Sequence, residues 1–249
     1  GNTSKIIGEI HKAKATKVDI VVFSELAICG YPPKDLLDYP SFIERCEVGL
    51  ALICAETDGI AVIVGGPAWS NLQKGKKLYN SAFFYADKKL LRRIDKTLLP
   101  TYDIFDEYRY FQPNEVFECV EYKGERIAVT VCEDLWNLDD EKLYKVTPMD
   151  ELIGQKPSVM INLSGSTYSY NHVEKRRTRM QLNAKTYGIP LFYVNQVGGN
   201  TDILFDGGSM FINRMGEIAE ECEFYKEDFK VIKWDSSNIY EDNHQDYYD

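Results

Sequence analysis

The sequence has no apolar stretch near the length of about 18 residues that a membrane-spanning helix requires, and no secretory signal segment. Its six cysteines form no C-x-x-C pair, and their scattered spacing fits neither a zinc site nor a dense disulfide framework. A formal net charge of −10 disfavours nucleic-acid binding, which needs clustered Lys and Arg. We therefore expect a cytoplasmic protein with reduced thiols, without a metal site and without a nucleic-acid or membrane partner.

The composition is that of a globular protein, with 44% hydrophobic and 27% charged residues. Short β-branched runs predict strands at residues 18–23, 60–66, 81–86, 89–95, 126–131, 158–163, 190–195 and 208–213. Amphipathic runs predict helices at residues 39–56 and 172–187, and another around Ile6, Ile7 and Ile10 after a Ser/Thr cap. This mixture predicts an α/β sandwich in one continuous domain over residues 1–235.

The two ends of the chain carry expectations of their own. The chain begins without methionine and already in a helical pattern, which suggests that a first strand is missing ahead of Gly1. Residues 236–249 are acidic and rich in tyrosine, and we expect them to be a connector toward a further domain.

Three predicted strands end at, or just before, a chemically active side chain. Glu25 follows one strand, Lys96 another and Cys132 a third. A thiol nucleophile, a carboxylate that accepts its proton and an ammonium that stabilises an oxyanion are what attack on a carbonyl group requires. The alternative for Cys132 is a small buried residue, and charges at strand ends are common where the chain re-enters solvent. Residue types alone leave both interpretations open.

Five longer segments narrow the choice: FSELAICGYPPKDLL (23–37), DKTLLPTYDIFDEYRYF (95–111), VCEDLW (131–136), NLSGSTY (162–168) and NQVGGNTDILFDGGS (195–209). Together they resemble the nitrilase superfamily of carbon–nitrogen hydrolases. Within that superfamily they are most similar to the glutaminase domain of glutamine-dependent NAD synthetases. The resemblance extends from about residue 1 to about residue 235.

The resemblance implies a fold and a catalytic triad. The fold would be a four-layer α-β-β-α sandwich. The triad would be Glu25, Lys96 and Cys132, the same residues that the strand ends indicate. L-Glutamine would be hydrolysed through a glutamyl thioester on Cys132, with Glu25 as general base and Lys96 supporting the oxyanion.

The resemblance also implies a set of substrate-binding residues, namely Tyr102, Glu107, Glu133, Ser166 and His172. Glu107 would be a second acid beside the triad, with a solvated loop acid as the alternative. Glu133 would offer its backbone N–H to the oxyanion and its carboxylate to the substrate ammonium. His172 stands where the family usually has Lys or Arg, and Lys175 is the alternative cation one helical turn further along.

The remaining expectations concern partners and other charged segments. No S-G-G-x-D-S phosphate loop is present, so the chain itself needs no cofactor; ATP and Mg would serve a C-terminal NAD synthetase domain that amidates deamido-NAD. A homo-oligomer is expected. Asp134 is interpreted as a helix N-terminal acid, FDGGS (205–209) as an architectural turn, and Arg176, Arg177 and Arg179 as a solvated helix face.

Two other functions remain open at this point. One is a stand-alone nitrilase-type amidase that acts on a different small amide. The other is a catalytically silent domain that serves only as an oligomerisation scaffold, which the presence of all three triad residues disfavours.

Overall fold

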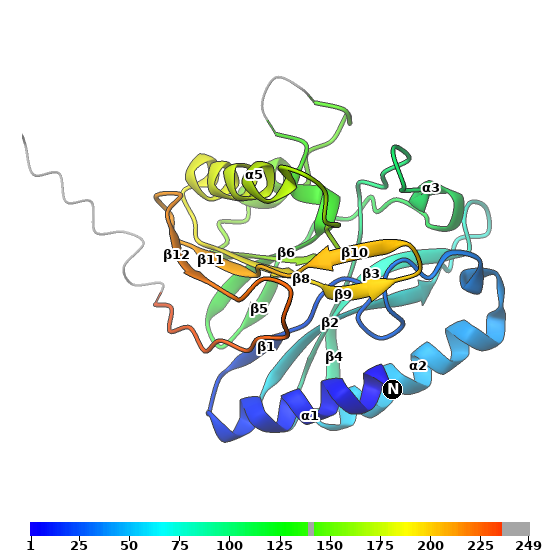
Figure 1. Ribbon diagram of the computed structural model, residues 1–249. Coiled ribbons are helices and arrows are strands. Elements are labelled where there is room, and N and C mark those ends of the chain that lie inside the picture. The colour runs from blue at the N-terminus through cyan, green and yellow to red at the C-terminus, as the bar shows by residue number, and fades with distance from the viewer. Residues whose placement is uncertain (139–141, 236–249) are drawn as a thin grey trace, which may run out of the picture.

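The computed structural model describes residues 1–138 and 142–235, which form a mixed α/β fold built on two principal sheets (Figure 1). The first sheet has the order β1 (Ile20–Val22), β2 (Ala61–Trp69), β3 (Leu78–Ala86) and β4 (Lys89–Asp95). β1 pairs with β2 in parallel, and the other neighbouring strands are antiparallel.

The second sheet has the order β12 (Ile218–Glu221), β11 (Met210–Ile212), β8 (Leu191–Asn195), β7 (Val159–Ser164), β6 (Glu125–Val131) and β5 (Val120–Tyr122). Its central strands β6, β7 and β8 are parallel neighbours. Their carboxyl ends therefore meet at one edge of the sheet, where open α/β sheets place their ligands. β9 (Val197–Asn200) and β10 (Ile203–Asp206) form a separate hairpin.

Helices cover the outer faces of both sheets (Figure 1). α1 (Asn2–Ala15) and α2 (Pro40–Ala55) pack on the first sheet, and α4 (Pro148–Ile153) and α5 (His172–Tyr187) pack on the second. A third cluster, which includes Phe84 from β3 and Val129 from β6, lies between the two sheets. Burial on both faces explains why β2 is a continuous apolar run and β7 is largely apolar.

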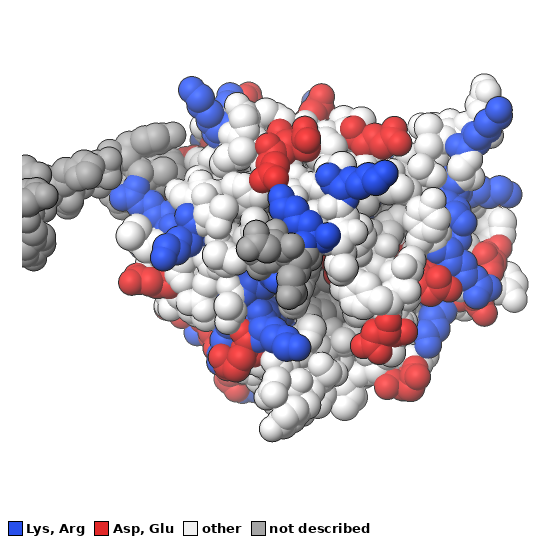
Figure 2. Space-filling model, turned by 90° about the horizontal axis from the view of Figure 1, so that it is seen from above, with Lys and Arg blue, Asp and Glu red and all other residues white. Residues whose placement is uncertain are grey.

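Three further segments are short helices. They are η1 (Lys34–Asp38), α3 (Glu107–Tyr110) and η2 (Cys132–Leu135). Among the residues that the structure describes, no helix is both long and apolar enough to cross a membrane. Basic and acidic side chains are interspersed over the face that lies uppermost in Figure 1, above α5 (Figure 2).

The main strands and helices predicted from the sequence are confirmed. The predicted helices at 39–56 and 172–187 match α2 and α5 to within a residue. The predicted strands at 81–86 and 89–95 form the hairpin β3–β4, whose turn residues Asp87 and Lys88 have φ angles of 48° and 61°. Positive φ at both positions gives the twist that a two-residue hairpin turn needs.

One expectation was wrong, four strands were not predicted, and one expectation concerns residues that the structure does not describe. Gly1 occupies the N-cap of α1 without a side-chain hydrogen bond, so the predicted Ser/Thr cap is incorrect. The strands β5, β9, β10 and β12 were not predicted, because three or four residues are too few for a clear pattern. The proposed connector at 236–249 lies outside the described residues.

Candidate active site

The structure brings the acid and the ammonium of the predicted triad into direct contact. Lys96, which directly follows β4, donates from Nζ to Glu25 Oε1 at 2.8 Å and to Glu107 Oε1 at 2.7 Å. Lys96 and Glu25 are fully buried. Cys132 is buried beside them, close enough for both charges to act on the pKa of its thiol. Four residues far apart in the sequence therefore form one cluster.

Glu25 is held by donors on both carboxylate oxygens. Asn80 Nδ2 donates to Oε1 at 2.7 Å, in addition to Lys96, and the backbone N–H of Gly165 donates to Oε2 at 2.8 Å. β2 approaches this loop so closely that a Cβ atom on Gly65 would lie 2.3 Å from the backbone nitrogen of Leu26. Glycine at position 65 is thus required for the placement of Glu25.

Cys132 lies where β6 turns sharply into η2. Its φ angle of 43° is in the left-handed region, which non-glycine residues seldom adopt and which is concentrated at functional sites. The hydroxyl of Ser164 donates to Cys132 Sγ at 3.3 Å. The turn fixes the sulfur at the carboxyl edge of the parallel strands.

Asp134 has a larger role than that of a helix N-terminal acid. Its Oδ1 accepts the backbone N–H groups of Thr97 and Leu98 at 3.0 and 2.8 Å, and its Oδ2 accepts that of Val131 at 3.0 Å. The side chain therefore ties the segment that carries Lys96 to the strand that carries Cys132. Burial raises the pKa of Asp134 to about 7, although these three N–H groups favour its charged form.

Burial and the charges of the cluster together keep the thiol of Cys132 protonated. Burial, followed by the charge of Glu25, raises the pKa of the Cys132 thiol well above its usual value, and Lys96 and Ser164 oppose this shift. Burial also raises the pKa of Glu107 to about 7. Burial disfavours the ammonium of Lys96, but Glu107 and Glu25 outweigh that effect and raise its pKa. At neutral pH the thiol is protonated, so its attack needs a base.

Two of the predicted substrate-binding residues lie together. The hydroxyl of Tyr102 donates to Glu133 Oε1 at 2.8 Å, and the hydroxyl of Tyr144 donates to the same oxygen at 3.2 Å. Burial raises the pKa of the Glu133 carboxyl. The carboxylate thus has two phenolic partners directly beside the nucleophile.

Ser166 and His172 also lie together. Ser166 Oγ lies 3.1 Å from His172 Nε2, and the imidazole stacks on Trp136 with ring centroids 5.4 Å apart. Burial and the charge of Arg176 lower the pKa of His172, so the imidazole is neutral at pH 7. Lys175, the alternative cation, is exposed to solvent.

The expectation of a solvated arginine face on α5 was wrong for Arg176. This side chain is fully buried and donates to Asp206 Oδ2 at 2.9 Å and to Ser166 Oγ at 3.5 Å. Asp206 is its charge partner, so the FDGGS segment does more than form a turn. Arg177, by contrast, makes the expected ion pairs with Glu174 and Glu221.

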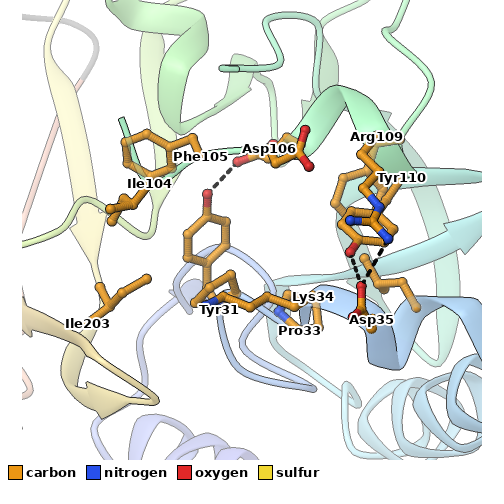
Figure 3. Close-up of a pocket in the computed structure, with 14 residues that line it drawn as sticks. Tyr31, Pro33, Lys34, Asp35, Ile104, Phe105, Asp106, Arg109, Tyr110 and Ile203 are labelled. Carbon is orange, nitrogen blue, oxygen red and sulfur yellow. Dashed lines mark hydrogen bonds and ion pairs between the residues drawn. The ribbon is translucent and has the colours of Figure 1, made fainter. Parts of the chain in front are cut away.

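A cavity of about 290 Å³ borders the cluster on the side of Tyr31 and Glu107. Figure 3 shows Ile203 and the segment that carries Ile104 and Phe105 on one side of Tyr31. The Tyr31 hydroxyl donates to Glu107 Oε1 at 2.6 Å. Cys132 does not line this cavity, which contacts the charged cluster only through Tyr31 and Glu107.

Sequence reasoning missed several residues of the site. Asn80, Tyr31, Tyr144 and Ser164 all bond to predicted site residues. Among these, Asn80 had a local signal, as an amide inside the largely apolar strand LYNSAFFYA. Within the described residues, no group of three or more His, Cys, Asp or Glu side chains is arranged to hold a metal ion.

Comparison with known proteins identifies the family of the chain. The family model described as carbon-nitrogen hydrolase matches residues 1–242. A glutamine-dependent NAD(+) synthetase from Synechocystis sp. is 41% identical over 244 residues, which are 95% of this chain and 44% of that protein. A solved glutamine-dependent NAD+ synthetase from Acinetobacter baumannii, in complex with ADP, has a TM-score of 0.82 at 33% identity.

The likeness to the Acinetobacter protein covers 91% of this chain and 41% of that one. The chain thus spans about two fifths of the length of these synthetases. An amidase from Nesterenkonia, of the nitrilase superfamily, has a TM-score of 0.75 at 17% identity and shares the fold.

Proposed function

The chain belongs to the carbon–nitrogen hydrolase family, and we propose that it hydrolyses the side-chain amide of L-glutamine through a thioester on Cys132. The observation that carries this proposal is the buried contact between Lys96 and Glu25, at 2.8 Å, beside the thiol. The names of the relatives support glutamine as the substrate. We further propose the four-layer α-β-β-α sandwich of this superfamily as the architecture.

The reaction proceeds in two halves. Glu25 accepts the proton of the Cys132 thiol as the sulfur attacks the amide carbon. The ammonium of Lys96 and the backbone N–H of Glu133 stabilise the oxyanion, and ammonia leaves with the proton from Glu25. Water then attacks the thioester with the same base, which frees glutamate and restores the thiol. Glu107 keeps the Lys96 ammonium charged and in place, because it is that ammonium's second carboxylate partner.

The amino-acid end of the substrate is recognised by the remaining predicted residues. The Glu133 carboxylate binds the substrate ammonium, and the Tyr102 hydroxyl holds that carboxylate in position. Ser166 and a neutral His172 hydrogen-bond the substrate carboxylate, while the buried charge of Arg176 lies behind them. Weak binding of simple amides follows, because they lack both charged groups.

The ammonia is consumed by a second domain of a longer protein. We propose a glutamine-dependent NAD synthetase in which a C-terminal domain uses ATP and Mg to amidate deamido-NAD. The length covered in the relatives supports this, and so does the ADP held by the Acinetobacter baumannii protein. Residues 1–235 form the glutaminase domain, residues 236–249 lead to the synthetase domain, and the protein is a cytoplasmic homo-oligomer.

A comparison of substrates tests the proposed reaction. Ammonia release is measured from L-glutamine and from simple aliphatic amides at equal concentrations, with Cys132→Ala as the control. We expect a clear preference for glutamine and no release by the variant. Preference for the aliphatic amides would instead support the stand-alone amidase. No release from any amide, with a Cys132 that thiol reagents do not label, would support the silent scaffold.

A further inference from the structure

A chain of two buried hydroxyl groups leads to the sulfur of Cys132. Ser164, the last residue of β7, donates from Oγ to Cys132 Sγ at 3.3 Å. Tyr193 on the neighbouring strand β8 donates from its hydroxyl to Ser164 Oγ at 3.1 Å. Ser164 is fully buried and Tyr193 is 1% exposed, so water does not compete for these bonds.

The serine hydroxyl has the hydrogen-bonding capacity for both of these contacts. A serine hydroxyl has one proton and two lone pairs. Tyr193 gives its proton to the oxygen of Ser164, which leaves the proton of Ser164 free to point at the sulfur. The Tyr193 hydroxyl also contacts the side chain of Ser166, so its own oxygen has a further partner. The serine is thereby held as a donor to sulfur.

The charges around the sulfur make such a donor valuable. Two buried carboxylates, Glu25 and Glu107, surround a single ammonium, Lys96, which bonds to both of them. Once Glu25 has accepted the thiol proton, the charges of Lys96 and Glu107 offset each other, so no net positive charge is left beside the thiolate that attacks the amide and that leaves again when the thioester collapses. Hydrogen bonds to a charged group are about twice as strong as neutral ones.

We propose that Ser164 is a catalytic residue that stabilises the Cys132 thiolate by donating a hydrogen bond to it, and that Tyr193 is a positioning residue that orients this proton. The proposal rests on the proposed role of Cys132 as the nucleophile. Ser164 forms and breaks no covalent bond. Its hydrogen bond shortens as negative charge develops on sulfur and relaxes when that charge passes to the substrate oxygen.

The pH dependence of thiol alkylation tests this proposal independently of glutamine. Wild-type protein, Ser164→Ala and Tyr193→Phe are treated with iodoacetamide from neutral to alkaline pH, and labelling of Cys132 is followed by peptide mass spectrometry. Loss of a hydrogen bond to a charged group should slow labelling of Ser164→Ala about tenfold below the thiol pKa and move the profile up by about one pH unit. Tyr193→Phe should show a smaller shift in the same direction.

Matched variants separate this role from general packing. Ser158→Ala lies just before the start of the same strand, and Tyr85→Phe lies in the core between the first sheet and helices α1 and α2. Both variants should leave the profile unchanged. Ser164→Thr keeps the hydroxyl and should therefore show the same labelling profile as the wild-type protein. If Ser164→Ala fails to fold, as judged by circular dichroism, Tyr193→Phe alone decides the question. An unchanged profile in the folded variants overturns the proposal, whereas a folded wild-type protein whose Cys132 is labelled but which releases no ammonia from glutamine overturns the proposed function.

Discussion

Replacing Lys96 by methionine removes the only cation bonded to two buried carboxylates, Glu25 and Glu107, in the described part of the chain. Both carboxylates are at most 5% exposed, so water cannot replace the lost partner. Breaking a buried ion pair by removing one member costs about 3–5 kcal/mol of unfolding free energy. We expect a loss of that size for Lys96→Met at about pH 8, where both carboxylates would otherwise be charged.

The loss of unfolding free energy in Lys96→Met should become smaller as the pH falls. Without Lys96, the pKa of Glu107 rises further above the value of about 7 that burial already gives it. Folded protein then binds more protons than unfolded protein between the unfolded and folded pKa values, so stability falls with rising pH in that window. The slope is about 1.4 kcal/mol per pH unit for one proton. Acidification therefore restores stability to the variant relative to wild type.

Urea unfolding, followed by circular dichroism at mildly alkaline and mildly acidic pH, measures this effect. Lys89→Met, an exposed lysine on the same hairpin, is the control and should change stability by less than about 0.5 kcal/mol. The double variant Lys96→Met/Glu107→Gln should recover part of the loss, because one orphaned charge is gone. A loss for Lys96→Met below about 1 kcal/mol at alkaline pH, or no recovery in the double variant, would refute the argument.

Two further changes probe the same cluster. Glu107→Gln removes a negative charge that raises the pKa of the Cys132 thiol. Labelling of Cys132 by iodoacetamide should therefore become about threefold faster, while glutamine turnover falls. Unchanged labelling would contradict the assigned electrostatics. Gly65→Ala places a Cβ atom 2.3 Å from the backbone beside Glu25, so turnover should fall about a hundredfold, whereas Gly154→Ala, whose Cβ meets nothing within 4 Å, should leave it unchanged. Equal turnover in these two glycine variants would show that β2 does not position the acid.

The three candidate catalytic residues could be singled out from the sequence because each lies just after a strand. Glu25 and Cys132 follow buried apolar runs and Lys96 follows the amphipathic strand KLLRRID, and a residue just after a strand lies near the end of that strand in the sheet. The resemblance of the local segments then assigned chemistry to Glu25, Lys96 and Cys132. Which strands lie next to one another depends on the whole fold, so contact between these side chains was a hypothesis until the structure placed Lys96 against Glu25.

The residues that hold the triad could not be predicted in the same way. Asn80 and Ser164 act through partners 55 and 32 positions away in the sequence, and no local pattern specifies such a pairing. For Arg176 the sequence did contain a signal that the side chain is buried. It shares the buried face of α5 with Met180 and Ala184 at helical spacing, so periodicity alone would have placed it inside.

The central claim is that Cys132 carries the acyl group of the substrate. Isotopically labelled glutamine is mixed with the protein, the reaction is quenched with acid, and the peptides are mapped by mass spectrometry. We predict a glutamyl label on the peptide that contains Cys132, and no label in Cys132→Ala. Steady ammonia release without a label at this position, or with a label on another residue, would contradict the claim.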